Sequence, residues 1–190
     1  MDTSELHSGR NGARDVRVWD RLVRTVHWGV ALIVLVNGFA DKPGDAVHTW
    51  LGYTAGALVL LRLAWGVIGT RPALFTAFPP SPRRAVRHLR DVMAGSRDTH
   101  LSHNPLGALM VYNIWLTLLL LCVSGYMMGT IRFFGVAWVE DMHDLLFDWL
   151  MVSVVLHLAG VAFDSWRTKV PLVRAMVTGR KYLPKGVRAE

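Results

Sequence analysis

Cysteine is almost absent from this chain of 190 residues. Cys122 is the single cysteine, so an intramolecular disulfide cannot form. The sequence also lacks the Cys-x-x-Cys-His motif that attaches c-type haem. Any haem that the chain binds would therefore be held without thioether bonds, as b-type haem. The sequence contains neither an internal repeat nor a glycine-rich phosphate-binding loop.

Charged residues are also scarce, at 18% of the chain, and four long segments carry almost none. Segments 25–40, 104–131 and 149–163 have no charged residue, and segment 46–70 has only Arg62. A helix needs about 20 apolar residues to cross the hydrocarbon core of a bilayer. The sequence therefore predicts an all-α integral membrane protein built as a four-helix bundle. The predicted transmembrane helices cover about residues 22–40, 46–69, 104–130 and 140–165.

The net charge of +7 is concentrated in three regions. Of 21 Lys and Arg residues, five lie in the first 24 residues, six between residues 71 and 103, and seven from residue 167 onward. With four crossings, these regions share one side of the membrane, and the positive-inside rule makes that side cytoplasmic. We expect a multi-pass protein of the bacterial inner membrane with both termini in the cytoplasm. This segregated charge argues against a nucleic-acid partner.

The remaining segments are short. Residues 1–16 are rich in Ser, Gly, Asn and charged residues, which predicts a disordered cytoplasmic N-terminus. Residues 17–185 form the predicted membrane domain, and 186–190 form a tail. After the proline-rich run 78–82, a basic amphipathic helix is predicted over about 82–95. We expect it to lie on anionic membrane lipid, with a docking surface for a cytoplasmic partner as the alternative.

Four histidines lie within the predicted spans, at two depths. His143 and His157 are fourteen residues apart on the fourth span, so an α-helix separates them by about 21 Å and nearly four full turns. Both side chains therefore leave one face of the helix, near opposite sides of the bilayer. His27 lies near the cytoplasmic start of the first span, and His48 near the outer start of the second. Depth thus pairs His27 with His157 and His48 with His143.

Each predicted pair offers imidazole nitrogens from two helices to opposite sides of one metal ion. This arrangement indicates two bis-histidine haems b, located between the helices and stacked across the membrane. Iron with both axial positions filled has no open site for oxygen, which favours electron transfer. A helix–helix hydrogen bond or a metal-transport path are the alternatives for buried membrane histidines. The remaining histidines fall in loops and are predicted to be solvated: His7, His88, His100 and His103.

Arg62 lies fourteen residues after His48, so it faces the same way at the depth of the inner pair. An arginine within a membrane helix is costly unless it is paired, and a haem propionate is a suitable partner. Small residues such as Gly38, Gly52 and Gly56 follow the histidines. They would allow either a porphyrin or a neighbouring helix to come close to the backbone.

An acidic group lies on the outer part of the fourth span. Asp144 and Asp148 are four residues apart, so they share a face of that helix. They are candidates for a proton-transfer site, or for a site beside a quinone if the chain exchanges electrons with one. Glu140 and Asp141 fit a solvated helix start instead, which the helix dipole favours.

Five sequence features occur together over about residues 17–185. They are Val26-His27-Trp28, His48-Thr49-Trp50-Leu51-Gly52, Leu61-Arg62-Leu63-Ala64-Trp65-Gly66, His103-Asn104-Pro105-Leu106-Gly107 and the spacing of His143 and His157. This combination resembles the bacterial cytochrome b561 family, which includes the b-type cytochrome subunits of nickel–iron hydrogenases. The resemblance implies a four-helix membrane core with two haems b. It also implies roles for five residues: axial ligation by His27, His48, His143 and His157, and a propionate contact from Arg62.

These features predict a membrane dihaem cytochrome that transfers electrons between the quinone pool and a redox partner protein. The partner would be a periplasmic c-type cytochrome, another redox protein or a hydrogenase, although hydrogenase subunits commonly have a fifth helix. One alternative is direct oxidation of a small reductant such as superoxide, with quinone as the acceptor. Another is a haem-free membrane anchor that recruits a partner through its basic cytoplasmic surfaces. Whether the chain is itself an enzyme stays open.

Overall fold

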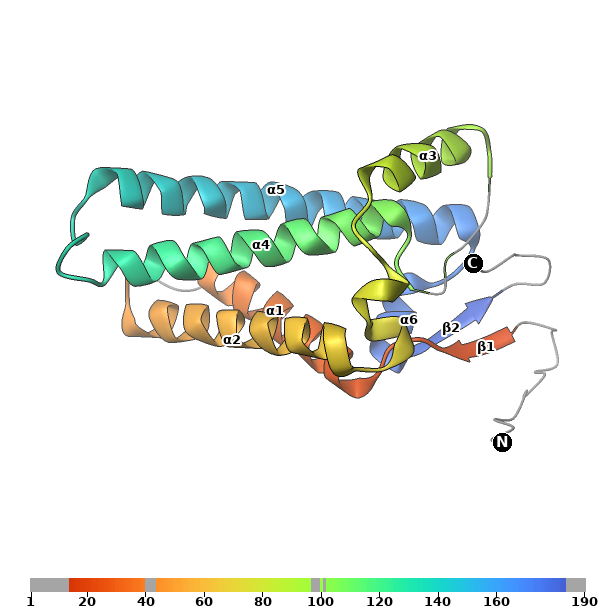
Figure 1. Cartoon of the computed structure of the whole chain (residues 1–190), viewed down its shortest axis with the longest axis horizontal. Coiled ribbons are helices and arrows are strands. Elements are labelled where there is room, and N and C mark those ends of the chain that lie inside the picture. Colours follow the sequence, from red (N-terminus) through yellow and green to blue (C-terminus); the bar gives the residue numbers. More distant parts are fainter. Residues whose placement is uncertain (1–13, 40–43, 97–99, 101, 184–190) are drawn as a thin grey trace.

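The computed structural model describes residues 14–39, 44–96, 100 and 102–183 (Figure 1). Four long helices run along the molecule: α1 (Arg21–Phe39), α2 (Ala46–Ile68), α4 (Pro105–Met128) and α5 (Ala137–Thr168). The shorter helices are α3 (Pro82–Met93), α6 (Leu172–Thr178) and the 3-10 turns η1 (Arg71–Ala73) and η2 (Phe75–Ala77). Two short strands, β1 (Arg14–Arg17) and β2 (Arg180–Leu183), complete the described elements.

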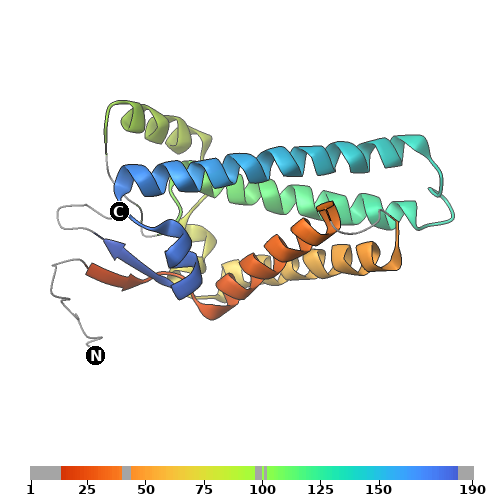
Figure 2. The ribbon, with the colours of Figure 1, turned by 180° about the vertical axis from the view of Figure 1, so that it is seen from behind.

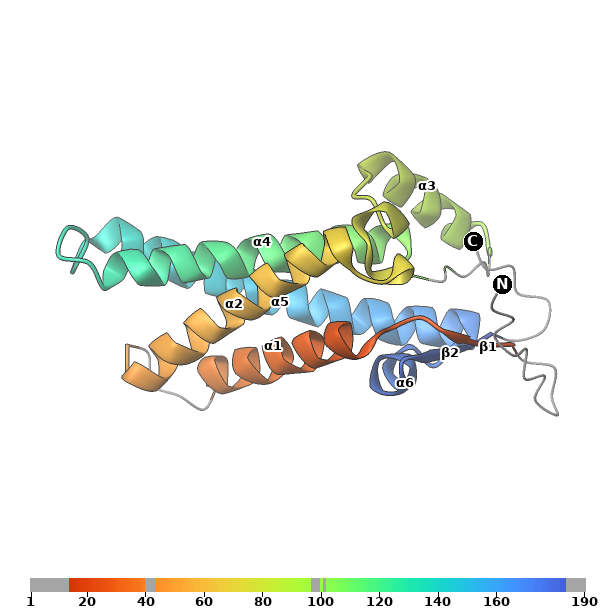
Figure 3. The same cartoon turned by 60° about the horizontal axis from the view of Figure 1, so that its bottom comes forward.

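The four long helices form an up-and-down bundle. Helix α1 packs along α2, α4 packs along α5, and α2 also contacts α4 (Figures 1 and 3). Both strands, α3 and α6 lie at one end of the bundle, which we call the strand end (Figure 2). The connections from α1 to α2 and from α4 to α5 lie at the opposite end, which we call the loop end. This arrangement confirms the predicted all-α four-helix bundle.

The outer surface of the bundle is apolar. Each long helix has the length and composition to cross a membrane. Large side chains on them face outward, such as Leu32 on α1, which is 61% exposed, and Leu145 on α5, which is 68% exposed. An apolar surface of this extent is unfavourable in water and suits contact with lipid chains. The chain is therefore a multi-pass membrane protein, as predicted.

The helix boundaries differ from the predicted ones mainly in α5. This helix has 32 residues, begins three residues before the predicted start at 140, and ends three residues after the predicted end at 165. Its length of about 48 Å exceeds the hydrocarbon thickness of about 30 Å, so it extends beyond the membrane core. Hydropathy underestimates the length of α5, because both ends of this helix carry charged residues.

The two strands were not predicted. β1 pairs with β2 in antiparallel register, from Arg14 opposite Leu183 to Arg17 opposite Arg180, and Asp15 forms an ion pair with Arg180 at 2.9 Å. Residues 14–16 are thus part of a strand, which contradicts the predicted disorder for that part of segment 1–16. Residues 1–13 and the tail 186–190 lie outside the described residues, so the predictions for them stay untested.

The bundle centre is apolar. Val59 of α2, Leu118 of α4 and Leu150 of α5 form a buried cluster that joins three helices. A second buried cluster closes the strand end and contains Val18, Trp19, Val23, Ala73 and Ala175. The two apolar clusters therefore occupy the bundle centre and the strand end.

Asp20 links the start of α1 to the end of α2. Its carboxylate accepts hydrogen bonds from the Val23 backbone N–H at 2.9 Å, from Trp65 Nε1 at 2.8 Å and from Thr70 Oγ1 at 2.7 Å. Burial by itself raises the pKa of the Asp20 carboxyl, but these hydrogen bonds hold that pKa below its ordinary value. Asp20 is therefore both the N-cap of α1 and the polar junction of the strand end.

We predict that Asp20→Ala lowers the free energy of unfolding by about 1–3 kcal/mol, because three donors lose their acceptor. Thermal unfolding of the full chain in detergent, followed by circular dichroism, measures this change. The ionised carboxylate stabilises the fold above its ordinary pKa, and this contribution is lost as the pH falls through the lowered pKa. The difference between wild type and variant should therefore shrink below about pH 4.

The matched control is Asp45→Ala at the loop end. Asp45 precedes α2, but its side chain makes no capping hydrogen bond. Equal destabilisation by the two substitutions would contradict a special role for Asp20.

Candidate functional site

The structure brings the four histidines of the spans together in two pairs. His48 of α2 faces His143 of α5 near the loop end, with ring centroids 6.3 Å apart and an interplanar angle of 61°. His27 of α1 faces His157 of α5 nearer the strand end, with ring centroids 6.4 Å apart and an angle of 53°. We call these the outer pair and the inner pair. Helix α5 thus contributes one histidine to each pair.

The spacing within each pair fits a shared metal ion. A bond between a metal ion and an imidazole nitrogen is about 2 Å long, and the ring centre lies about 1 Å beyond the nitrogen. Two imidazoles on opposite sides of one ion therefore have centroids about 6 Å apart. The Nδ1 atoms of His27 and His48 are buried without a hydrogen-bond partner, so neither ring is held by a protein contact at that atom. The histidines fit axial ligation of a haem iron in both places.

Ser124 fixes the ring of His143, and sequence reasoning did not identify it. Its side chain is fully buried, and Oγ lies 2.8 Å from His143 Nδ1. The same hydroxyl donates its one proton to the backbone oxygen of Leu121 at 3.1 Å. The Ser124 oxygen must then accept the Nδ1–H of His143, which leaves Nε2 of His143 unprotonated. An imidazole binds a metal ion in this form.

Glycines next to two of the histidines leave open space. A Cβ placed on Gly52, one turn after His48, would have no heavy atom within 4 Å. The same is true of Gly160, which follows His157 by three residues. Gly160 is exposed, so its open space is the outer surface of the bundle, whereas the half-buried Gly52 leaves space beside His48 that fits a planar macrocycle.

The other two glycines serve helix packing. A Cβ on Gly56 would lie 2.9 Å from Cys122 Sγ, and one on Gly38 would lie 3.3 Å from the Phe147 ring. Cys122 also donates its S–H to the Gly52 carbonyl at 3.3 Å. Of the two explanations that the sequence left open, close helix packing therefore applies to Gly56 and Gly38.

Arg62 is buried on α2 towards the strand end, with 3% of its surface exposed. Its Nη2 donates to the Ala73 carbonyl at 3.0 Å, and the guanidinium lies over the rings of Phe78 and Trp115 at 5.7 and 5.1 Å. Its Nη1 is buried without a partner. Among the described residues no carboxylate forms an ion pair with Arg62. A buried guanidinium of this kind fits an anionic group of a bound cofactor.

His103 was predicted to be solvated, but its ring is half-buried in the strand end. Its ring lies between Trp19 and Phe78, with centroid distances of 4.8 Å to each, and its Nδ1 is buried without a partner. Burial, followed by the nearby charges of Lys181 and Arg62, lowers the pKa of His103 to about 3. His103 is thus a neutral imidazole inside the strand end.

His88 of α3, His100 and His7 were also predicted to be solvated. His88 and His100 are half-buried and pack ring against ring at 5.3 Å. Burial and the neighbouring His100 lower the pKa of His88. His7 lies outside the described residues.

Asp144 and Asp148 do not join either histidine pair. Both side chains are exposed on α5, and neither has a hydrogen bond or ion pair within the described part of the chain. Asp148 lies about 7.5 Å further along α5 than His143, towards the bundle centre.

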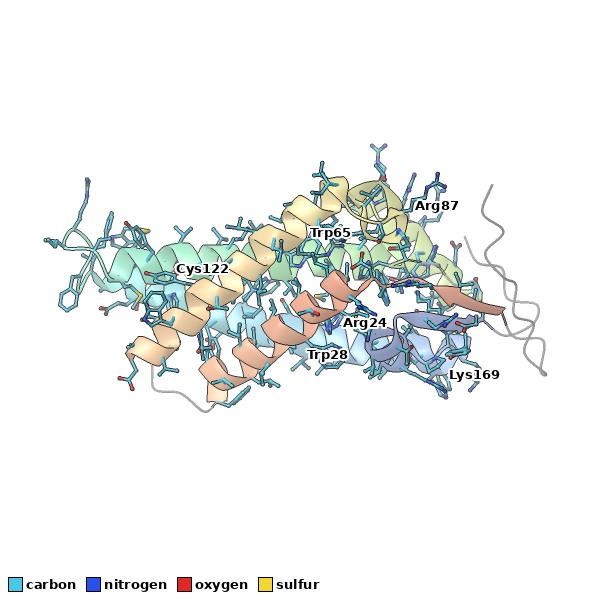
Figure 4. All side chains as sticks on the ribbon, turned by 90° about the horizontal axis from the view of Figure 1, so that it is seen from below. Arg24, Trp28, Trp65, Arg87, Cys122 and Lys169 are labelled. Carbon is cyan, nitrogen blue, oxygen red and sulfur yellow. The ribbon has the colours of Figure 1, made fainter. Side chains whose placement is uncertain are left out.

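A groove of about 590 Å³ lies on α1 beside the inner pair. It is lined by Arg21, Arg24, Thr25, Trp28, Gly29 and Leu32, of which Arg24 and Trp28 are labelled in Figure 4. The Trp28 ring packs edge-on against His27, at a centroid distance of 5.1 Å. Trp28, which lines the groove, therefore connects it directly to His27 of the inner pair.

The structure is a membrane-spanning helical bundle that carries two histidine pairs between its helices. The family model of the prokaryotic cytochrome b561 proteins matches residues 18–179. The chain belongs to the prokaryotic cytochrome b561 family. It is therefore a membrane b-type cytochrome of electron transfer that binds haem b. The chain matches no curated protein and no solved structure in the comparisons made.

We predict that Ser124→Ala weakens haem binding at the outer pair by about 10–100-fold, because the ring of His143 loses the contact that sets its tautomer. Haem content per chain and haem loss to apomyoglobin measure the effect. Ser153→Ala is the matched control, because Ser153 is equally buried but bonds to Asn113. Equal haem loss from the two variants would show that Ser124 has only a packing role.

Proposed function

We propose that the chain is a dihaem cytochrome b that transfers electrons across the bilayer, between the quinone pool and a redox partner protein. The observation that carries this proposal is the repeated spacing of the histidine pairs, 6.3 and 6.4 Å between centroids. His48 and His143 would ligate one haem, and His27 and His157 the other. Bound haem supplies one-electron oxidation and reduction at its iron.

The protein fixes the distance between the two sites. His143 and His157 lie about 21 Å apart along α5, which covers most of a hydrocarbon core of about 30 Å. The cluster of Val59, Leu118 and Leu150 lies in the bundle centre, and its apolar side chains exclude water from it. The two histidines of each pair would both hold the iron of a bound haem, and such a haem would serve electron transfer rather than oxygen binding.

The charge distribution supports a cytoplasmic strand end. The basic segments before α1, between α2 and α4 and after α5 all lie at this end of the bundle (Figure 1). The positive-inside rule then places the inner pair near the cytoplasm of a bacterial inner membrane, with both termini inside. Helix α3 supports the same orientation, because Val86, Leu89 and Met93 are exposed beside its arginines. Such a helix can lie on anionic lipid.

We assign quinone exchange to the groove beside His27. The groove opens on the apolar outer surface of α1, where Trp28 and Leu32 are exposed and a lipid-soluble quinone can enter. Arg21 supplies N–H donors for quinone oxygens, whereas Arg24 already donates from Nη2 to the Val177 carbonyl. Asp144 and Asp148 lie near the outer pair, away from this groove, and would serve proton transfer for a quinone that reacted at the outer pair instead.

The partner protein would exchange electrons at the outer pair, which lies nearest the loop end. A periplasmic c-type cytochrome, another periplasmic redox protein or a hydrogenase fits this position. Family membership argues against a haem-free anchor. Direct oxidation of superoxide has no specific support among the described residues. Comparing haem reduction by quinol with reduction by superoxide separates these two chemistries.

We predict that His143→Ala and His48→Ala remove the same haem, and that His27→Ala and His157→Ala remove the other. Each variant should retain about one haem per chain, since the intact pair keeps both of its ligands. Pyridine haemochrome analysis of the purified protein gives the haem number, and a redox titration shows which haem remains. His88→Ala should retain two haems. Loss of the same haem from His27→Ala and His48→Ala would contradict the pairing.

We predict that Trp28→Ala slows haem reduction by quinol about tenfold without changing the haem content, because the groove loses its aromatic wall. Stopped-flow absorbance with a soluble quinol measures the rate. Trp166→Ala is a suitable control, because Trp166 is an exposed tryptophan of α5 with 69% of its surface accessible. An unchanged rate in Trp28→Ala would exclude the groove as the site of quinone exchange.

A further inference from the structure

The strand end holds a half-buried histidine that neither pair uses. The ring of His103 lies between Trp19 from the N-terminal segment and Phe78 from the segment after η2. Its Nδ1 atom is buried and has no hydrogen-bond partner in the protein. A buried polar atom without a partner costs about 1–3 kcal/mol, so a partner outside the polypeptide is expected.

The chain holds His103 in this position from both sides. Asn104 follows it and caps α4, because the Gly107 N–H donates to Asn104 Oδ1 at 2.7 Å. Lys181 of β2 donates to the carbonyls of His100 and Ser102 at 2.9 Å each, immediately before His103. The position of the imidazole is therefore set by a helix cap and by a strand that is distant in sequence.

The surroundings of His103 are electropositive. Arg62 and His103 both contact the Phe78 ring, and Lys181 and His103 both contact the Trp19 ring. Arg62 and Lys181 are only 3% and 5% exposed. Asp20 and Asp164 act electrostatically on Arg62 and Lys181, but Asp20 forms no ion pair with Arg62 among the described residues, so the buried guanidinium favours a further anion nearby. The carboxylate of Asp20 already accepts three hydrogen bonds at the end of α2.

This electropositive region adjoins the inner pair. His157 and His27 are among the groups whose charges act on His103, after Lys181 and Arg62. Haem b carries two propionate carboxylates on one edge. Arg62 Nη1 and His103 Nδ1 are both buried and unpartnered, so one could serve each carboxylate or both could serve the same one.

We infer that His103 donates a hydrogen bond from Nδ1 to a carboxylate of the haem held by His27 and His157, beside Arg62. This inference rests on the proposed function and adds a residue to the inner site. The neutral imidazole, fixed between two aromatic rings, would orient the haem edge while Arg62 supplies the charge.

The test uses the full chain carrying His143→Ala, in which the inner haem is the one expected to remain. His103→Ala should lower the reduction equilibrium constant of this haem about tenfold, which corresponds to about 59 mV for one electron. The loss of a donor leaves the propionate charge less neutralised and thereby favours ferric iron. Resonance Raman bands of propionate bending should shift as well.

His103→Asn keeps an N–H donor and should retain the parent potential and Raman bands. His88→Ala is the control, since His88 is a half-buried histidine of the same end. Unchanged potential and Raman bands in His103→Ala would overturn the inference. So would changes of equal size, or equal haem loss, in the Ala and Asn variants, because that result indicates packing alone. If the chain carrying His143→Ala alone bound no haem, that result would instead contradict the proposed function.

Discussion

One face of α5 determines the geometry of both candidate sites. His143 and His157 are fourteen residues apart, and the helical repeat returns them to the same face about 21 Å apart. Each meets a histidine from another helix, His48 of α2 or His27 of α1. The position of α5 relative to α1 and α2 therefore sets both pair distances. Close contacts such as Gly38 with Phe147 of α5 help to fix that position.

The two ends of the bundle stabilise their sites differently. At the loop end, Ser124 bonds to His143, and Asn37 Nδ2 donates to the His48 carbonyl at 3.1 Å. At the strand end, aromatic rings surround Arg62 and His103, and Asp20 connects the helices. A cofactor with a hydrophobic ring and charged carboxylates would match the strand end, because its aromatic side chains suit the ring and Arg62 suits the carboxylates. The polar residues there are held by segments that cap the bundle.

The helices and the pairing of the histidines by depth could be predicted from the sequence, because both follow from helix rise and hydropathy. Other features depend on contacts between distant segments. β1 and β2 are four-residue strands more than 160 positions apart, too short for a periodic signal. The burial of His103 depends on Trp19 and Phe78, and composition alone indicates a loop there. Ser124 could not be recognised, because its role depends on the position of His143 one helix away.

The central claim is that two imidazoles ligate each haem iron. Low-temperature electron paramagnetic resonance of the oxidised, purified protein tests this claim most directly, because it reports the axial ligands of ferric haem. The account predicts only low-spin ferric signals, from two bis-imidazole haems per chain. A substantial high-spin signal, or a low-spin signal from one haem per chain, would contradict the account.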